Sequence, residues 1–315
     1  MTAEARRWYL SDITMESHNI VETRGLTKRY GNGVLAVDRL DLHVRHGEVY
    51  GFLGPNGAGK TTTLRMLVGL IRPTSGSAIV AGADPGAPAG LARIGSLVEN
   101  PGFYPYLSGR DNLRVIARLC RVPERRADAA LDEVGLLARA DEKFANYSMG
   151  MKQRLGVAAA LLKDPELLVL DEPSNGLDPE GMVEMREMIR GLGRGERTVL
   201  LSSHLLNEVE QICQRVGVIR HGQMVAEGTL DELKGAVGLT LRAQPQERAR
   251  ELLLQLLGAP AVGEQDGAFR LSVEPARAGE INTALVGAGM VVSELRPSEH
   301  SLEEIFLQLT QEQVS

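Results

Sequence analysis

One short segment constrains the fold of this chain more than any other: the run GPNGAGKT at residues 54–61. It fits the pattern G-x-x-x-x-G-K-[ST], it follows an apolar run at residues 49–53, and it precedes a helical pattern at residues 62–70. Glycines let the backbone wrap so that successive N–H groups point at one anion, and the helix N-terminus adds a positive dipole. The sequence therefore predicts a phosphate-binding loop between a buried strand and a helix.

The residues of this loop have predicted roles in holding a nucleotide. The Lys60 ammonium group would reach the β and γ phosphates, where it also assists catalysis, and the Thr61 hydroxyl would ligate Mg²⁺. The other residues supply backbone N–H groups and the shape of the loop. The expected nucleotide-binding residues of this segment are Gly54, Pro55, Asn56, Gly57, Ala58, Gly59, Lys60, Thr61 and Thr62.

A second motif, LLVLDE at residues 167–172, is an apolar run that ends in two carboxylates. A buried parallel strand would deliver them at its carboxyl end, where ligands bind in α/β sheets. We expect Asp171 to hold Mg²⁺ through water and Glu172 to orient and deprotonate the attacking water. An acidic pair that simply faces solvent at a strand end is the alternative for this motif taken alone.

The pattern along the chain predicts an α/β fold. Strand-like and helical runs alternate from residue 19 to residue 171, which favours a parallel core, and further buried strands are expected at residues 167–170 and 198–203. Between residues 101 and 163 helical patterns dominate, for example at residues 111–121 and 125–134. We therefore expect a P-loop NTPase core that carries an all-α insertion.

A change in composition near residues 235–238 marks a second, small α+β domain. Its expected strands lie at residues 239–242, 269–273 and 290–295, and its expected helices lie at residues 246–257, 276–286 and 301–311. The predicted organisation is an N-terminal arm at residues 1–18, an ATPase domain at residues 19–235 with its helical insertion at about 101–163, and an accessory or regulatory domain at residues 236–315.

Composition excludes several classes of function. The net charge of −6 and an aromatic content of 4% disfavour a protein that coats or stacks on nucleic acid. No apolar run approaches the roughly 18 to 20 residues of a membrane span. Cys120 and Cys213 lack metal-ligand spacing, and we expect both to be buried, reduced thiols of a cytoplasmic protein.

The phosphate loop is followed by YSMGMKQR at 147–154, LDEP at 170–173, SNGLD at 174–178 and SSH at 202–204. This ordered set of motifs resembles that of the ATPase subunits of ABC transporters, over residues 20–230. Within that family it is similar to the drug- and bacteriocin-export ATPases of the bacitracin and lantibiotic type, and residues 301–306 resemble their tails. The resemblance implies a Mg²⁺-dependent ATPase.

In this family two copies enclose two ATP molecules head to tail. The resemblance therefore implies that Ser148 and Gly150 contact the γ-phosphate of the ATP held by the partner copy. Ser148 also suits the N-cap of the following helix. The motif departs from the common L-S-G-G-Q form, since Met149 and Met151 replace its third and fifth residues, and we expect both methionines simply to pack.

The resemblance implies four further site residues. His204 would contact the γ-phosphate and help to hold the attacking water, and Asp178 would lie at the dimer seam, although an isolated Asp there would merely cap a helix. Tyr30 would stack on adenine, although a lone tyrosine is commonly a core or surface residue. Glu99 replaces the usual glutamine that ligates Mg²⁺ and senses the membrane subunit. A solvent-facing loop residue is the alternative for Glu99.

The expected protein is thus the ATP-binding, ATP-hydrolysing subunit of an exporter of an antibiotic, a peptide or another amphiphilic drug. Its expected partners are a second copy and an integral membrane permease, with no nucleic acid. Residues 102–111 are the expected docking surface for the permease. We expect a cytoplasmic protein that is peripheral on the inner face of the cell membrane. The alternatives are a non-transport ABC ATPase that acts on ribosomes or DNA, and a nucleotide-regulated binding module, which Glu172 and His204 oppose.

Overall fold

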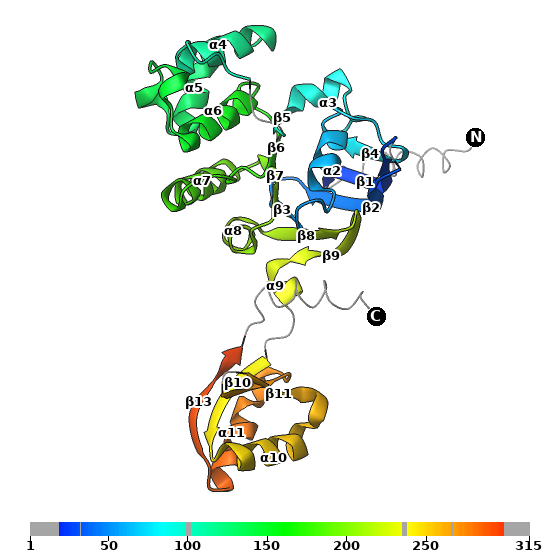
Figure 1. Ribbon diagram of the computed structural model, residues 1–315, viewed down its shortest axis with the longest axis vertical. Helices are drawn as coiled ribbons and strands as arrows, with labels where there is room; N and C mark the ends of the chain where they lie inside the picture. Colours follow the sequence, from blue (N-terminus) through cyan, green and yellow to red (C-terminus); the bar gives the residue numbers. More distant parts are fainter. Residues whose placement is uncertain (1–18, 32, 99–101, 235–237, 266, 299–315) are drawn as a thin grey trace, which may run out of the picture. The chain divides into compact units, whose positions relative to one another are not determined.

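The computed structural model describes residues 19–298 except 32, 99–101, 235–237 and 266 (Figure 1). The chain divides into two compact units between Thr229 and Leu230, a few residues before the boundary expected at residue 235. The expected arm at residues 1–18 and the expected helix at residues 301–311 lie outside the described residues.

The first unit is built around a six-stranded sheet with the order β5-β6-β7-β3-β8-β9. The first five of these strands are parallel, and β9 adds to the edge antiparallel to β8. Every residue of β3 and β7 is buried, as befits strands that are covered on both faces. The strands are β3 (Val49–Leu53), β5 (Ile94–Leu97), β6 (Leu167–Asp171), β7 (Thr198–Ser203), β8 (Arg215–Arg220) and β9 (Gln223–Thr229).

A separate antiparallel sheet with the order β2-β1-β4 flanks this core. Its strands β1 and β2 precede β3 in the chain, and β4 follows α2. It consists of β1 (Asn19–Arg29), β2 (Leu35–Arg45) and β4 (Ser75–Val80). The expectation of a parallel arrangement from residue 19 onward is therefore wrong for this segment. The short connection between β1 and β2 leaves no room for the crossover that parallel strands need. The sheet packs with α2 (Lys60–Leu67) into the main hydrophobic core.

The described residues between 102 and 163 form helices and short 3₁₀ turns, as the sequence predicts. Figure 1 shows α4, α5 and α6 gathered beside the edge of the sheet formed by β5 and β6. The helices of the first unit are α2, α3 (Pro88–Arg93), α4 (Gly109–Leu119), α5 (Arg126–Glu133), α6 (Met149–Leu161), α7 (Pro179–Leu192) and α8 (Leu206–Ile212).

The two cysteines differ in environment. Cys213 is buried, and burial raises the pKa of its thiol. Cys120 is exposed, so the expectation that it is buried is wrong. Helix α4 ends at Leu119, and Arg121 turns the chain with a positive φ of 57°, which leaves Cys120 outside the buried face of the helix.

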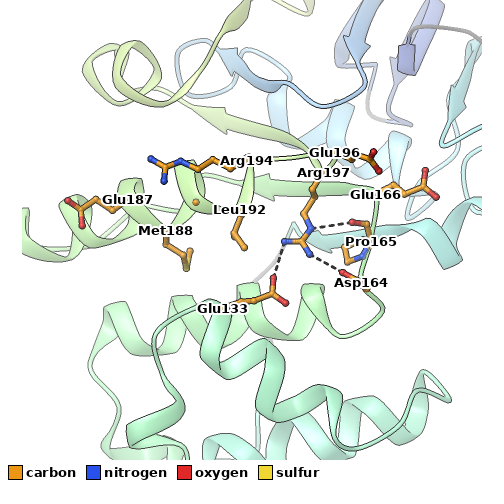
Figure 2. A pocket seen from close by; sticks show the side chains of 11 residues that line it. Glu133, Asp164, Pro165, Glu166, Glu187, Met188, Leu192, Arg194, Glu196 and Arg197 are labelled. Atoms are coloured by element: carbon orange, nitrogen blue, oxygen red, sulfur yellow. Dashed lines mark hydrogen bonds and ion pairs between the residues drawn. The ribbon is translucent and has the colours of Figure 1, made fainter.

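Arg197, directly before β7, links the helical segment to the sheet through hydrogen bonds (Figure 2). Its guanidinium donates to Glu133 Oε2 at 3.0 Å, to Asp164 Oδ1 at 3.0 Å and to the Pro165 carbonyl oxygen at 3.3 Å. A cavity of about 680 Å³ surrounds this group. The residues around it precede β6 and β7, so the cavity lies at the amino edge of the sheet, opposite the edge where α/β proteins bind ligands.

The second unit has the order of elements βαββαβ and an antiparallel sheet with the order β11-β12-β10-β13, which is a ferredoxin-like topology. Helices α10 and α11 cover the sheet and enclose a core that includes Leu241, Leu253 and Phe269. The elements are α9 (Leu230–Lys234), β10 (Gly238–Gln244), α10 (Gln246–Leu257), β11 (Val262–Gln265), β12 (Ala268–Leu271), α11 (Ala278–Gly287) and β13 (Val291–Ser298). Sequence patterns miss β11 because it has four residues and too few apolar ones.

None of the helices in the described part of the chain combines the length and the hydrophobicity that a membrane span requires.

Candidate nucleotide-binding and hydrolysis site

The phosphate loop connects the end of β3 at Leu53 to the start of α2 at Lys60. Gly59 adopts a φ of 111°, and a Cβ atom there would lie 2.5 Å from the Ala36 carbonyl oxygen. A Cβ atom at Gly54 would lie 2.4 Å from the Ile219 carbonyl oxygen. The loop can take this path only with glycine at both positions, because a side chain at either one would collide with a neighbouring carbonyl oxygen.

Lys60 is 5% exposed, and all of its ammonium protons have acceptors within the loop and its surroundings. Its Nζ donates to the Gly54 carbonyl oxygen at 2.6 Å and to the Pro55 carbonyl oxygen at 3.2 Å, and it lies 3.1 Å from Glu172 Oε1. An ammonium group has three N–H donors, so these three acceptors satisfy it. Lys60 thus connects the phosphate loop directly to Glu172.

Glu172 follows β6 and has a positive φ of 48°, which is uncommon for a non-glycine residue and occurs typically at functional positions. Its backbone N–H donates to the carbonyl oxygen of Ser202 at 3.2 Å and to its Oγ at 3.0 Å. Glu172 Oε2 lies 2.6 Å from His204 Nδ1. The structure therefore brings Lys60, Glu172 and His204 into one chain of contacts.

Asp171 and Thr61 line one cavity of about 500 Å³ at the carboxyl edge of the sheet. Asp171 Oδ1 accepts a hydrogen bond from Ser202 Oγ at 2.5 Å, which fixes the orientation of the carboxylate. The described residues contain no cluster of three or more His, Cys, Asp or Glu side chains that could hold a metal. One carboxylate and one hydroxyl fit Mg²⁺ nevertheless, because this ion usually keeps several waters and takes further oxygens from the phosphates of the substrate.

Three functional candidates lie within motifs that the sequence analysis noted, but it assigned them no role in the site. Ser202 lies directly opposite Asp171 in the parallel register of β6 and β7, and it holds both Asp171 and Glu172. Asn175 lines both the cavity of Asp171 and a second cavity of about 310 Å³ formed by the phosphate loop. Gln153 lines the first of these. Their proximity follows from strand pairing and loop packing, which local patterns do not reveal; the polar residues that end the buried strand β7 were the one available signal.

Ser148, Gly150 and Asp178 lie together around another cavity, of about 510 Å³. Ser148 is the N-cap of α6 and accepts from the Met151 N–H at 3.2 Å, as predicted, and Asp178 caps α7 by accepting from the Gly181 N–H at 3.1 Å. Within one chain, Ser148 and Gly150 do not line the cavity of the phosphate loop. Both Ser148 and Asp178 face solvent.

The two methionines of this motif differ. Met151 is buried, which confirms its predicted packing role. Met149 is 51% exposed and lines the cavity of Asp171, so the expectation that it simply packs is wrong. Met149 is the first residue of α6, where a side chain projects from the helix end toward the neighbouring loop and not into the core.

Tyr30 is half-buried, and its hydroxyl lies 3.4 Å from Thr62 Oγ1 at the end of the phosphate loop. The Lys28 ammonium group lies 5.4 Å from the centre of its ring. The aromatic ring therefore stands beside the loop, as an adenine-stacking residue requires. Glu99 lies outside the described residues; Leu97 and Val98, which precede it, line the cavity of Asp171 and Thr61.

The parallel sheet, the phosphate loop and the Lys60–Glu172–His204 contacts define a P-loop nucleotide-hydrolysing protein. The ABC transporter family matches residues 37–175. The chain is 42% identical over 297 residues to the bacitracin transport ATP-binding protein BcrA of Bacillus licheniformis, covering 92% of this chain and 97% of that protein.

A second relative and a solved structure indicate the same family. The chain is 41% identical over 305 residues to the daunorubicin resistance ATP-binding protein DrrA3 of Streptomyces coeruleorubidus, covering 91% of this chain and 94% of that protein. The solved structure of an ATP-binding subunit of an ABC transporter superposes with a TM-score of 0.60 at 29% identity, over 68% of this chain and 92% of that one. This chain belongs to the ATP-binding subunits of ABC transporters, and it is an ATPase.

Proposed function

We propose that this chain powers the export of an antibiotic, a peptide or another amphiphilic drug by hydrolysing ATP in a Mg²⁺-dependent manner. The observation that carries the proposal is the identity of about two residues in five to a bacitracin transport protein and a daunorubicin resistance protein, over more than nine tenths of this chain. That span includes the ferredoxin-like unit and not the ATPase core alone.

The proposed chemistry uses the contacts described above. Glu172 accepts the proton of the attacking water, and the imidazole of His204, 2.6 Å from its carboxylate, keeps that carboxylate oriented. Lys60 neutralises phosphate charge as it develops. Mg²⁺, held by Thr61 and Asp171 with Glu99 as a further proposed ligand, would supply additional neutralisation of the phosphate oxygens.

ATP-binding subunits of ABC transporters pair with membrane permeases and form dimers. We propose a head-to-tail dimer in which Ser148 and Gly150 of one copy complete the phosphate loop of the other. The exposure of Ser148 and Asp178, and their separation from the loop cavity of their own chain, support this arrangement. The N-terminus of α6 at Ser148 would present its positive dipole to the phosphates.

The proposed permease contact lies on the segment that precedes α4, and the proposed location of the chain is the cytoplasm, at the inner face of the membrane. Tyr104 and Tyr106 are 47% and 67% exposed, and their ring centres lie 5.7 Å apart. Buried Asn112 fixes this segment, since it accepts from the Tyr104 N–H at 2.8 Å and donates to the Tyr104 carbonyl oxygen at 3.0 Å. Two exposed rings on a fixed loop form the kind of aromatic anchor that protein interfaces use.

Replacing Tyr106 with alanine is predicted to weaken co-purification with the permease in detergent by about tenfold, the loss expected when one aromatic anchor is truncated. ATP binding by the same variant should remain at the wild-type level. Leu119→Ala, which removes another exposed apolar side chain, is the matched control. Equal recovery of permease with Tyr106→Ala and with the wild type would contradict the docking assignment.

The export proposal is tested by expressing this chain, together with the membrane permease that co-purifies with it, in a sensitive bacterial host. The expected result is increased resistance to bacitracin or daunorubicin that disappears with Glu172→Gln. Resistance that is unaffected by Glu172→Gln would contradict ATP-driven export. Recovery of the chain with ribosomes or DNA, and not with the membrane protein, would favour the non-transport alternative.

A further inference from the structure

Glu208 is a carboxylate buried beside the hydrolysis site, although no sequence motif singles it out. It lies in the first turn of α8, four residues after His204, and it is 5% exposed. Its neighbours on the same helix, Val209 and Ile212, are apolar core residues. A buried carboxylate costs free energy unless it makes hydrogen bonds. Its presence therefore calls for a reason beyond packing.

One oxygen of Glu208 contacts the residue that precedes His204. Ser203 Oγ lies 3.4 Å from Glu208 Oε2 and accepts from the Leu205 N–H at 2.9 Å. The Ser203 carbonyl oxygen accepts from the Gly54 N–H at 3.3 Å, at the start of the phosphate loop. Ser203 thus connects Glu208 to the His204 loop and to the phosphate loop.

The other oxygen of Glu208, Oε1, is buried and makes no hydrogen bond with the residues that the structure describes. Ser174 is buried, and neither Ser174 Oγ nor Glu208 Oε1 has a hydrogen-bond partner in the part of the chain that the structure describes. Burial raises the pKa of the Glu208 carboxyl, and the hydroxyls of Ser174 and Ser203 and the charge of Arg186 offset this only in part, while Glu172 adds to it. Ser174, which belongs to the segment after Glu172, is thus one of the groups that act on the Glu208 carboxyl.

A hydrogen bond between the Ser174 hydroxyl and Glu208 Oε1 would remove the cost of leaving both atoms buried without a partner. Ser174 belongs to the segment between Glu172 and Asp178, and the latter caps α7. A movement of that segment toward α8 would close the contact. Glu208 would then join the Glu172 segment, through Ser174, to the His204 loop, through Ser203.

We propose that Glu208 is a positioning residue for ATP hydrolysis. By bridging Ser174 and Ser203, it keeps Glu172 and His204 in their correct relative positions. The proposal rests on the ATPase activity of the chain. It assigns Glu208 no contact with ATP, so its removal should lower kcat and leave the KM for ATP unchanged. A misplacement of about 1 Å in a catalytic group can cost an enzyme about 100-fold in rate, so a smaller displacement should cost about tenfold.

Ser174→Ala gives the sharpest test, because fold stability and activity should respond differently. The substitution removes a buried hydroxyl without a partner, so it should leave the melting temperature unchanged or raise it. It should nevertheless lower the kcat of the full-length chain about tenfold, with the KM for ATP within about twofold of the wild type. Wild-type kcat in a folded Ser174→Ala protein would overturn the proposal.

Glu208→Ala and Glu208→Gln extend the test. The alanine variant should lose about tenfold in kcat, and the glutamine variant, which retains both hydrogen-bonding atoms, should recover most of it. The loss in the double variant Ser174→Ala/Glu208→Ala should equal that of either single variant, because the two residues act as a unit. Losses that multiply, or equal rates for the alanine and glutamine variants, would overturn the proposal.

Glu210→Ala, on the same helix and half-exposed, is the matched control and should keep the wild-type kcat. If the wild-type chain did not hydrolyse ATP, the proposed function would fail first. If the wild type hydrolysed ATP and Ser174→Ala did so equally well, the proposed function would stand and the role of Glu208 would fail.

Discussion

At the scale of single residues, the site is organised by paired charges. Lys60 is nearly fully buried, and Glu172 lies between it and His204. Buried charges are tolerated when they are paired and hydrogen-bonded, and removing one partner leaves the other charge buried without compensation. Substitutions in this group should therefore be designed to keep shape and hydrogen bonding while they change the chemistry.

Glu172→Gln meets that condition. The amide can retain the contacts with Lys60 and His204 but cannot accept a proton from water, so kcat should fall by about 100-fold or more. ATP affinity should be kept, and the ATP-bound dimer should accumulate. Steady-state hydrolysis, nucleotide binding and size-exclusion chromatography measure the three quantities. Glu180→Gln, exposed on α7, is the control, and hydrolysis at the wild-type rate by Glu172→Gln would refute the general-base role.

The buried Glu208 carboxyl predicts a pH dependence of stability. Burial raises its pKa in the folded state, so the native protein binds this proton more tightly than the unfolded chain does. The contribution to the free energy of unfolding is therefore largest below the unfolded pKa of about 4.3 and is lost as pH rises through the folded pKa. Denaturant titrations should show the free energy of unfolding of Glu208→Gln increasing relative to that of the wild type as pH rises from about 4.3 through the folded pKa. A difference between the two proteins that does not change with pH would contradict this prediction.

At the scale of elements, strongly patterned segments could be predicted and paired segments could not. The strands β3 and β7 and the helix α10 have the predicted bounds. The sequence patterns did not predict that β1, β2 and β4 form an antiparallel sheet, because alternation of apolar residues does not specify the partner of a strand. The same limit applies to the site: the loop and Glu172 are local motifs, whereas the contact of Ser202 with Asp171 depends on strand register.

Arg197 is predicted to stabilise the junction between α5 and the sheet. Arg197→Ala would remove three hydrogen bonds and leave Glu133 and Asp164 without this cation, at a cost of about 1–3 kcal/mol in the free energy of unfolding. Urea denaturation measures the change. Arg194→Ala, exposed beside the same cavity, should change stability by less than about 0.5 kcal/mol. Equal effects of the two substitutions would contradict the assigned role of Arg197.

At the scale of the whole molecule, the chain contains two units with separate hydrophobic cores. The phosphate loop, Asp171, Glu172, Ser148 and His204 all belong to the first. The second carries no described catalytic group, yet the relatives match over more than nine tenths of the chain. A full-length match of this kind indicates that both units belong to one working protein.

Calorimetry should resolve two unfolding transitions, because each unit has its own core. In the Glu172→Gln variant, which prevents turnover, ATP with Mg²⁺ should raise the midpoint of one transition only. At about 100 times the dissociation constant, the stabilisation is about 2.7 kcal/mol. A single transition that shifts as a whole would show that the two units unfold cooperatively.

The contact between Lys60 and Glu172 also affects which anions the loop accepts. We expect Glu172 to compete with free anions, because a phosphate or sulfate ion that reaches Lys60 must break the Lys60–Glu172 ion pair to form another and gains little. A polyphosphate chain also receives N–H groups along the loop and from the start of α2, and these additional bonds favour its exchange with the carboxylate. We therefore expect the Glu172 carboxylate to make the loop bind nucleotide polyphosphates in preference to the abundant small anions of the cell.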